Sequence, residues 1–213
     1  MRQIIDLTHT ICEEMPVYPG TEPPVIESPW SVEKDGFVEQ KLSFYAHIGT
    51  HIDAPAHMLP HAPTLDRMPV DAFIGQASVI RLPLVKGSSI DLSDLKSFEG
   101  LFKNSDFILL HTGWSKYWGQ DQYFHGYPVL SEEAALWIHS FNLKGVGADL
   151  ISLDAVETKN YSNHKTLLER GILIENLTNL EQLPETGFLF SCLPLKVVKG
   201  DGSPVRAVAI IGT

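Results

Sequence analysis

The histidines of this chain are unevenly spread, and their clustering limits the local structure that the backbone can adopt. Four of the nine histidines lie in one segment, HIGTHIDAPAHMLPH, at His47, His51, His57 and His61. The spacing of four between His47 and His51 suits a helix, but Gly49 and Pro55 disfavour one, because glycine is a poor helix former and proline breaks the hydrogen-bond ladder. The segment is therefore predicted to have an extended backbone.

Successive side chains of a β-strand point to opposite faces, so residues two apart share a face. His47, His51, Asp53 and His57 all occupy odd positions. A strand through residues 47–57 would aim these four side chains to one side and the isoleucines between them to the other. The sequence thus predicts three imidazoles and one carboxylate in one place.

Such a group is costly to bury without a common partner. Imidazole nitrogen and carboxylate oxygen are ligands of Zn²⁺, and they also suit Mn²⁺ or Fe²⁺. The alternative interpretation is a solvated, histidine-rich edge strand with no ligand. No cysteine lies near the cluster, which disfavours a closed structural zinc site and favours an open, catalytic one with positions left for water and substrate.

Composition excludes some partners. The chain has 16 Lys+Arg against 26 Asp+Glu and a formal net charge of −10, and no basic cluster reverses this locally, so we expect no nucleic acid. We expect no membrane, because no apolar run approaches the roughly 18–20 residues that span a bilayer, and the N-terminus lacks the apolar core of a secretory signal. Two cysteines, Cys12 and Cys192, are too few for a disulfide framework, although the sequence does not exclude one long-range disulfide between them. A cytoplasmic location fits best.

We expect one α/β domain over residues 1–213 with a mixed sheet, because strands and helices alternate in the middle of the chain between ends that are purely β. Ser131 is the expected N-cap of the central helix, with Glu132 and Glu133 in its first turn. The predicted strands are 2–8, 37–48, 77–82, 106–111, 144–149, 187–193 and 205–211, and the predicted helices are 92–98, 131–141 and 163–170.

The segment HIGTHIDAPAH matches the HxGTHxDxPxH signature of the putative cyclase family, which contains bacterial kynurenine formamidases and isatin hydrolase. The chain resembles this family of metal-dependent hydrolases along most of its length. The resembling segments are DLTHTICEEMPVYPG near the N-terminus, LLHTGWSKYW, VGADLISLD, HKTLLERGILIENLTNL and the C-terminal LPLKVVKGDGSPVRAVAII. The resemblance implies the family's swivelling β/β/α architecture.

The resemblance also implies a centre of two divalent metals, Zn or Mn, in each subunit. His47 and His51 would bind the first ion, and Asp53 would bridge both. His164 would bind the second ion, with Glu175 as a second bridging carboxylate. His57 would be the catalytic acid/base rather than a ligand. One ion held by His47, His51 and Asp53 alone would also be chemically viable.

The implied activity is hydrolysis of an amide C–N bond by metal-bound hydroxide, with His57 passing a proton to the leaving nitrogen. The expected small-molecule substrate is an aryl formamide such as N-formyl-L-kynurenine, which would place the chain in tryptophan catabolism. One alternative is ring opening of a cyclic amide or imide, as in isatin hydrolase. Another is a metal-dependent small-molecule binding protein without activity.

Aromatic side chains could hold an aromatic substrate, although plain packing explains Trp114 and Trp118 better. Tyr18 stands where kynurenine formamidases usually have tryptophan, and we expect it to bind substrate. Asp149 and Asp154 could orient the ligating histidines. The family's oligomers imply a homodimer or homotetramer, in which the Pro-rich loop from Pro16 to Pro29 could reach a neighbouring subunit.

Overall fold

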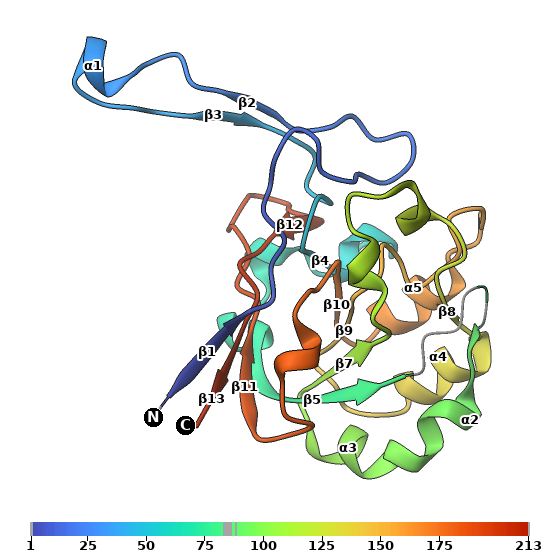
Figure 1. Ribbon diagram of the computed structural model, residues 1–213. Coiled ribbons are helices and arrows are strands. Elements are labelled where there is room, and N and C mark those ends of the chain that lie inside the picture. The colour runs from blue at the N-terminus through green and yellow to red at the C-terminus, as the bar shows by residue number, and fades with distance from the viewer. Residues whose placement is uncertain (1, 83–86, 88, 213) are drawn as a thin grey trace.

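The computed structural model of the protein describes residues 2–82, 87 and 89–212. Its largest feature is a nine-stranded sheet in the order β1-β13-β11-β5-β7-β9-β10-β4-β12 (Figure 1). Strands β5, β7, β9 and β10 run parallel to one another, and the remaining pairs are antiparallel. The predicted mixed-sheet α/β fold is confirmed. The strands are β1 (Gln3–Asp6), β4 (His51–Asp53), β5 (Ile74–Arg81), β7 (Phe107–His111), β9 (Gly145–Ala148), β10 (Ile172–Glu175), β11 (Phe188–Ser191), β12 (Gly202–Pro204) and β13 (Val208–Ile211).

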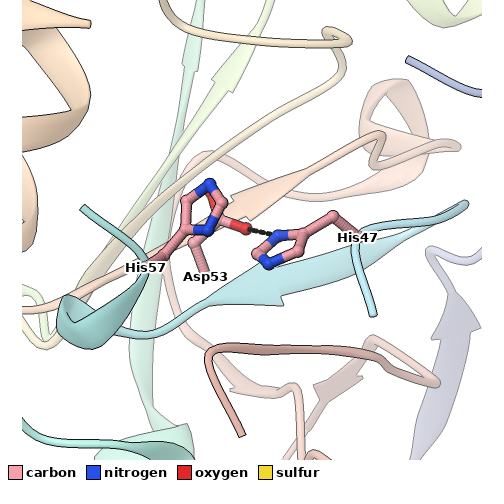
Figure 2. Close-up of side chains that lie close together, drawn as sticks. All are labelled: His47, Asp53 and His57. Atoms are coloured by element: carbon pink, nitrogen blue, oxygen red, sulfur yellow. Dashed lines mark hydrogen bonds and ion pairs between the residues drawn. The ribbon is translucent and has the colours of Figure 1, made fainter. Parts of the chain in front are cut away.

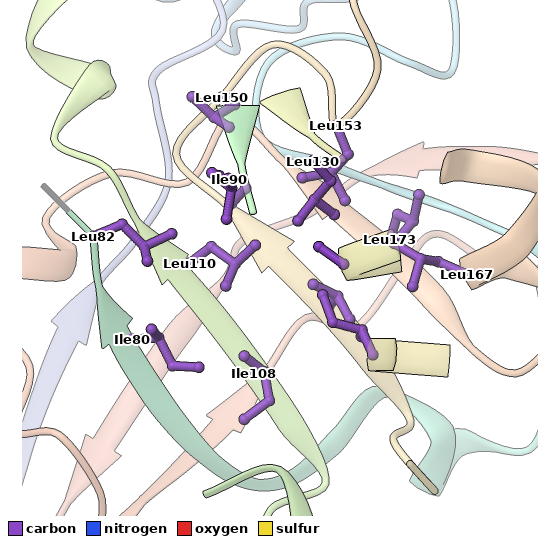
Figure 3. Packing of buried hydrophobic residues seen from close by; sticks show 14 of the residues in the cluster. Ile80, Leu82, Ile90, Ile108, Leu110, Leu130, Leu150, Leu153, Leu167 and Leu173 are labelled. Atoms are coloured by element: carbon purple, nitrogen blue, oxygen red, sulfur yellow. The ribbon is translucent and has the colours of Figure 1, made fainter. Parts of the chain in front are cut away.

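The central parallel strands are buried on both faces, which explains their nearly continuous apolar sequences. In β7, Phe107 to Leu110 are all fully buried. Ile108 and Leu110 join a core on one face, together with residues of the helices, whereas Phe107 and Leu109 join a second core on the other face. Figure 3 shows the first core, where Ile80, Ile108 and Leu110 pack towards the segments that carry Leu130, Leu153 and Leu167.

Helices cover one face of the parallel strands. The predicted helix 131–141 is observed as α4, in which the Ser131 hydroxyl accepts a hydrogen bond from the backbone N–H of Ala134 at 3.3 Å. The predicted helix 92–98 is split into a short α-helix and a 3₁₀ turn at Lys96–Phe98. The helices are α1 (Val32–Asp35), α2 (Leu92–Leu95), α3 (Glu99–Asn104), α4 (Glu132–His139) and α5 (Ser162–Leu168).

An arm formed by β2 (Val25–Glu27), α1 and β3 (Lys41–Ser43) projects away from the sheet (Figure 1). The predicted strand 37–48 is therefore wrong over most of its length, since only Lys41–Ser43 pairs, with β2. A second small sheet joins β6 (Ser89–Ile90) and β8 (Val129–Leu130). Among the described residues, no helix has the length and apolar character needed to cross a membrane.

Three strands at one edge of the large sheet bring distant parts of the sequence together. Strand β4 lies between β10 and β12, antiparallel to both. In this register Glu175 lies opposite His51, and Gly202 lies opposite Asp53. Helix α5, which follows β9 and precedes β10, supplies His164. Pairing of these strands thus places four separate segments around one point.

Candidate metal centre

The histidine segment is extended only in its middle. Strand β4 covers His51–Asp53, so the predicted continuous strand over 47–57 is wrong at both ends. Gly49 has φ +56°, a left-handed turn that glycine adopts without strain. Pro55 begins a 3₁₀ turn that carries His57. Two turns, rather than one alternating strand, bring His47 and His57 to the side of Asp53.

The predicted ligands do converge in the structure. Asp53 and Glu175 are 1% and 6% exposed. His51 Nε2 lies 3.3 Å from Asp53 Oδ1 and 3.6 Å from Glu175 Oε2. His164 Nε2 lies 3.6 Å from Asp53 Oδ2 and 3.1 Å from Glu175 Oε1. Two imidazoles, one from β4 and one from α5, therefore lie close to the same two carboxylates.

His51 is held in one tautomer by the backbone. Its Nδ1 lies 2.9 Å from the carbonyl oxygen of Gly49. A carbonyl oxygen can only accept, so Nδ1 carries the hydrogen. In the neutral imidazole, Nε2 then has a lone pair directed at two carboxylate oxygens. This arrangement requires a cation or an additional proton between them.

Asp154 holds His164 in the same manner. Its Oδ2 lies 2.6 Å from His164 Nδ1, and the carboxylate also accepts the backbone N–H groups of Asn163 and His164 at the start of α5. Burial alone would lower the pKa of His164, but its hydrogen bonds to Asp154 and Glu175 raise it well above the usual value. Asp154 thus fixes Nδ1 of His164, and Nε2 of the same ring points towards Asp53 and Glu175.

His47 completes the pattern. Its Nδ1 lies 2.6 Å from Asp53 Oδ1 (Figure 2), and its Nε2 lies 3.1 Å from Asp201 Oδ2. Burial lowers the pKa of His47, but Asp53 and Asp201 outweigh burial and raise it to about 9. Gly202 makes room for this ring, because a Cβ at that position would lie 2.4 Å from His47 Cε1.

His57 lies next to His47, with ring centroids 4.0 Å apart. Its Nδ1 is 3.6 Å from Asp201 Oδ2. Figure 2 shows the imidazoles of His57 and His47 close to the carboxylate of Asp53. Burial lowers the pKa of His57, so its neutral form is favoured.

The chemistry of these donors fits divalent cations. Ligand atoms of His47, Asp53 and His57 lie within 4.8 Å of one another, and so do those of His51, Asp53 and Glu175. Asp53 belongs to both groups. Among the described residues, all ion-pair partners of Asp53 and Glu175 are imidazoles, not lysine or arginine. Two buried carboxylates that face only imidazoles suit a metal as their common partner.

These residues form the floor of a cavity of about 350 Å³. Tyr18, predicted to bind substrate, lies in its wall and donates its hydroxyl hydrogen to the carbonyl of Val156 at 3.2 Å. Trp30, Trp114 and Trp118 are not part of the wall. The remaining wall includes Thr21, Tyr45, Met58, Ile151, Ser152 and Tyr161.

Sequence reasoning missed Asp201, Tyr45 and Tyr161. Asp201 lies in the C-terminal segment KGDGSP, which the family resemblance includes, but its contact with His47 depends on the pairing of β12 with β4. Of the two aspartates expected to orient histidines, Asp154 contacts His164. Asp149 instead accepts hydrogen bonds from the backbone N–H groups of Thr112 and Gly113.

Comparison with known proteins agrees with this geometry. The family model described as Putative cyclase matches residues 5–155. An uncharacterised protein of Methanocaldococcus jannaschii is 35% identical over 212 residues, which cover 98% of this chain and 100% of that protein. A kynurenine formamidase of Bacillus cereus is 30% identical over 206 residues, which cover 96% of this chain and 95% of that enzyme.

Solved structures share the whole fold. Isatin hydrolase A from Labrenzia aggregata, bound to benzyl benzoate, matches with a TM-score of 0.88 at 26% identity, over 100% of this chain and 94% of that one. A structure described as a potential metal-dependent hydrolase with cyclase activity matches with a TM-score of 0.80 at 27% identity, over 100% of both chains.

Proposed function

The chain belongs to the putative cyclase family of metal-dependent hydrolases, and on that premise we propose that it hydrolyses the amide C–N bond of an aryl formamide such as N-formyl-L-kynurenine. The observation that carries this proposal is the convergence of three imidazoles on the buried carboxylates of Asp53 and Glu175. The family resemblance seen in the sequence is confirmed.

We assign the two metal positions to these donors. His47 and His51 would hold one divalent ion and His164 a second, with the carboxylates of Asp53 and Glu175 available to both. A bound divalent ion lowers the pKa of water to about 7 and stabilises negative charge on a carbonyl oxygen. The nitrogen and oxygen donors suit both Zn²⁺ and Mn²⁺.

His57 is assigned the transfer of a proton. Its Nδ1 lies towards Asp201, so Nε2 is the atom that would carry a proton to the leaving amine nitrogen. The lowered pKa of His57 favours the neutral imidazole, which is the form that can first accept a proton from the attacking water and then pass it to the leaving nitrogen. Asp201 lies near both His57 and His47 and would keep the two rings in place.

The cavity wall supports an aromatic substrate. Tyr18, Tyr45 and Tyr161 line it together with Met58 and Ile151. Flat aromatic and apolar side chains of this kind bind planar rings, whereas the few polar groups fix orientation. Kynurenine formamidases at 29% to 30% identity support an aryl formamide as the substrate class.

A second candidate is the ring opening of a cyclic amide. It is favoured by the TM-score of 0.88 to isatin hydrolase A. In that reaction the leaving nitrogen stays attached to the product, whereas formamide hydrolysis releases formate. Both reactions use the same donors and the same proton transfer by His57.

One experiment tests the proposed function. The purified protein is assayed with formanilide, N-formyl-L-kynurenine, isatin and hydantoin, before and after removal of metal with a chelator. We expect hydrolysis of the formamides, its loss on chelation and its return with Zn²⁺ or Mn²⁺. Preferential turnover of isatin would instead support the second candidate. Turnover that chelation leaves unchanged would contradict the proposal, and metal binding without turnover would point to an inactive binding protein.

We also propose that the chain forms a homodimer or homotetramer through the arm. The rings of Trp30 and Phe37 pack against each other at a centroid distance of 5.8 Å and are 41% and 50% exposed. A two-stranded hairpin is marginally stable on its own, so a partner surface that covers these rings would stabilise the arm. Sedimentation analysis of the wild type and of Phe37→Ser tests this: the variant should dissociate, and a monomeric wild type would contradict the proposal.

The cytoplasm is the compartment we propose for the chain. Cys12 and Cys192 are both free thiols, and Cys192 is buried. Free thiols persist in a reducing compartment. Cell fractionation with a cytoplasmic marker enzyme checks the location, and recovery with secreted proteins would contradict it.

A further inference from the structure

Asn176 immediately follows Glu175 at the end of β10 and has an unusual backbone. Its φ is +57°, a left-handed conformation that asparagine tolerates better than most residues. The residue is only 2% exposed. A buried polar side chain in this conformation needs specific hydrogen bonds to be stable.

Those hydrogen bonds run to the turn that precedes His51. The Asn176 amide Nδ2 donates to the carbonyl oxygen of Gly49 at 2.8 Å. The Asn176 backbone carbonyl accepts from the hydroxyl of Thr50 at 2.6 Å. Asn176 therefore holds Gly49 and Thr50, two of the three residues between His47 and His51.

The carbonyl of Gly49 is also the acceptor for His51. It receives hydrogen bonds from Asn176 Nδ2 and from His51 Nδ1, the latter at 2.9 Å. Gly49 has no side chain to restrict its peptide plane, so the direction of its carbonyl depends on these contacts. A change at Asn176 would thus alter the acceptor that fixes the His51 ring.

Tyr123 fixes the Asn176 amide in turn. Its hydroxyl donates to Asn176 Oδ1 at 2.7 Å. Burial raises the pKa of Tyr123 well above its usual value, so the hydroxyl remains a donor. Tyr123 is fully buried, and its backbone carbonyl accepts a hydrogen bond from the Trp114 indole at 3.0 Å.

We propose that Tyr123 and Asn176 are positioning residues for His51, acting in series through the Gly49 carbonyl. The inference rests on the proposed function, since it takes His51 as a metal ligand. Neither side chain is among the residues that line the cavity. Their role is to hold His51 Nε2 at the distance from Asp53 and Glu175 that a shared cation requires.

The test measures metal affinity rather than turnover. Wild type, Asn176→Gly, Tyr123→Phe and the double variant are stripped of metal, and their Zn²⁺ affinity is measured by competition with a chromogenic chelator. Glycine keeps the left-handed backbone at position 176, so Asn176→Gly removes only the side chain. Tyr123→Phe removes only the hydroxyl. Ser78→Ala is the control, because it removes a hydrogen bond of 2.8 Å between the buried Ser78 side chain in β5 and Ser105, and neither residue lines the cavity.

Asn176→Gly should weaken Zn²⁺ binding about 10–100-fold, the usual effect of losing a residue that orients a ligand. Tyr123→Phe should weaken binding by less, and the double variant by no more than Asn176→Gly, because Tyr123 acts through Asn176. Ser78→Ala should lower the melting temperature and leave the affinity unchanged.

Two results would overturn the inference while leaving the proposed function intact. One is wild-type affinity in Asn176→Gly. The other is a full additional loss on adding Tyr123→Phe to Asn176→Gly, which would show that Tyr123 acts independently. A wild-type protein that binds no Zn²⁺ or Mn²⁺ would contradict the proposed function itself.

Discussion

The Nδ1 atom of His164 lies 2.6 Å from Oδ2 of Asp154, and both side chains are buried. The same arrangement recurs at two other rings, with the Gly49 carbonyl at His51 and Asp201 at His47. Each imidazole is thus fixed by an acceptor on its outer side and faces Asp53 or Glu175 with its other nitrogen. This is how proteins orient histidines that bind metals.

Asp154→Asn should weaken metal binding at the position held by His164 and Glu175. An amide in this place loses the charge that holds His164 Nδ1–H, and the expected loss of affinity is about 10–100-fold. Metal content and affinity, measured by elemental analysis after dialysis against a series of metal-buffered solutions, check this. A variant with wild-type metal content at every free concentration would contradict the role of Asp154.

Asp149→Asn is the matched control for that variant. Asp149 is a buried carboxylate five residues earlier in the chain, and it holds the backbone of Thr112 and Gly113 instead of a histidine. Its replacement should lower the melting temperature, since buried acceptors for N–H groups are lost. Metal affinity should stay close to that of the wild type.

His57→Gln should retain metal and lose turnover. Glutamine keeps the size and polarity of the side chain but transfers no proton, so the expected fall in kcat is about 10²–10⁴-fold. Formanilide assays and elemental analysis of the same sample give both quantities. His57 also lies within reach of His47 and Asp53, and complete loss of bound metal in the variant would show that it is a ligand instead.

Local sequence patterns predicted the central strands β5, β7 and β9, which are apolar and bounded by turns, but not β10 (Ile172–Glu175). The strand predicted over 77–82 is observed as β5 and the strand over 106–111 as β7. The prediction over 47–57 was wrong outside His51–Asp53 because alternation alone ignores the turn at Gly49. His47 and His57 nevertheless reach Asp53, by turns that no alternating pattern describes.

Side-chain contacts that depend on the pairing of distant strands could not be predicted from local sequence patterns. The approach of Asp201 to His47 follows from the register of β12 on β4, and neither strand carries a pattern that specifies this pairing. His164 and Glu175 were expected only from the family resemblance, since each alone is an ordinary residue of a helix or a strand. Their proximity to Asp53 follows from the packing of α5 and the pairing of β10 with β4.

Gly202→Ala should disturb His47. The added Cβ would lie 2.4 Å from His47 Cε1, and the ring would have to move away from Asp53. We expect weaker metal binding, about 10-fold or more. Gly100→Ala is the control, because no atom lies within 4 Å of a Cβ there, and alanine in α3 should stabilise the fold by about 0.5–1 kcal/mol. Wild-type metal affinity in Gly202→Ala would contradict the position assigned to His47.

Tyr18→Ala should raise KM for formanilide more than for N-methylformamide. Tyr18 lies in the cavity wall, so its ring would contact the aryl group and not the reacting amide. Loss of aromatic contact of about 1 kcal/mol corresponds to a change in KM of about fivefold. Steady-state kinetics with both substrates check this, and an equal effect on both would indicate that Tyr18 supports the fold and not the aryl group.

In the proposed centre, Asp53 and Glu175 share divalent metal with His47, His51 and His164. The most direct measurement is the number of metal ions bound per chain, obtained by equilibrium dialysis of chelator-treated protein against Zn²⁺ or Mn²⁺ and elemental analysis. Two ions per wild-type chain are expected, with a large loss of both in Asp53→Asn because Asp53 contacts both positions. Absence of bound metal in the wild type, or equal metal content in Asp53→Asn, would contradict the account.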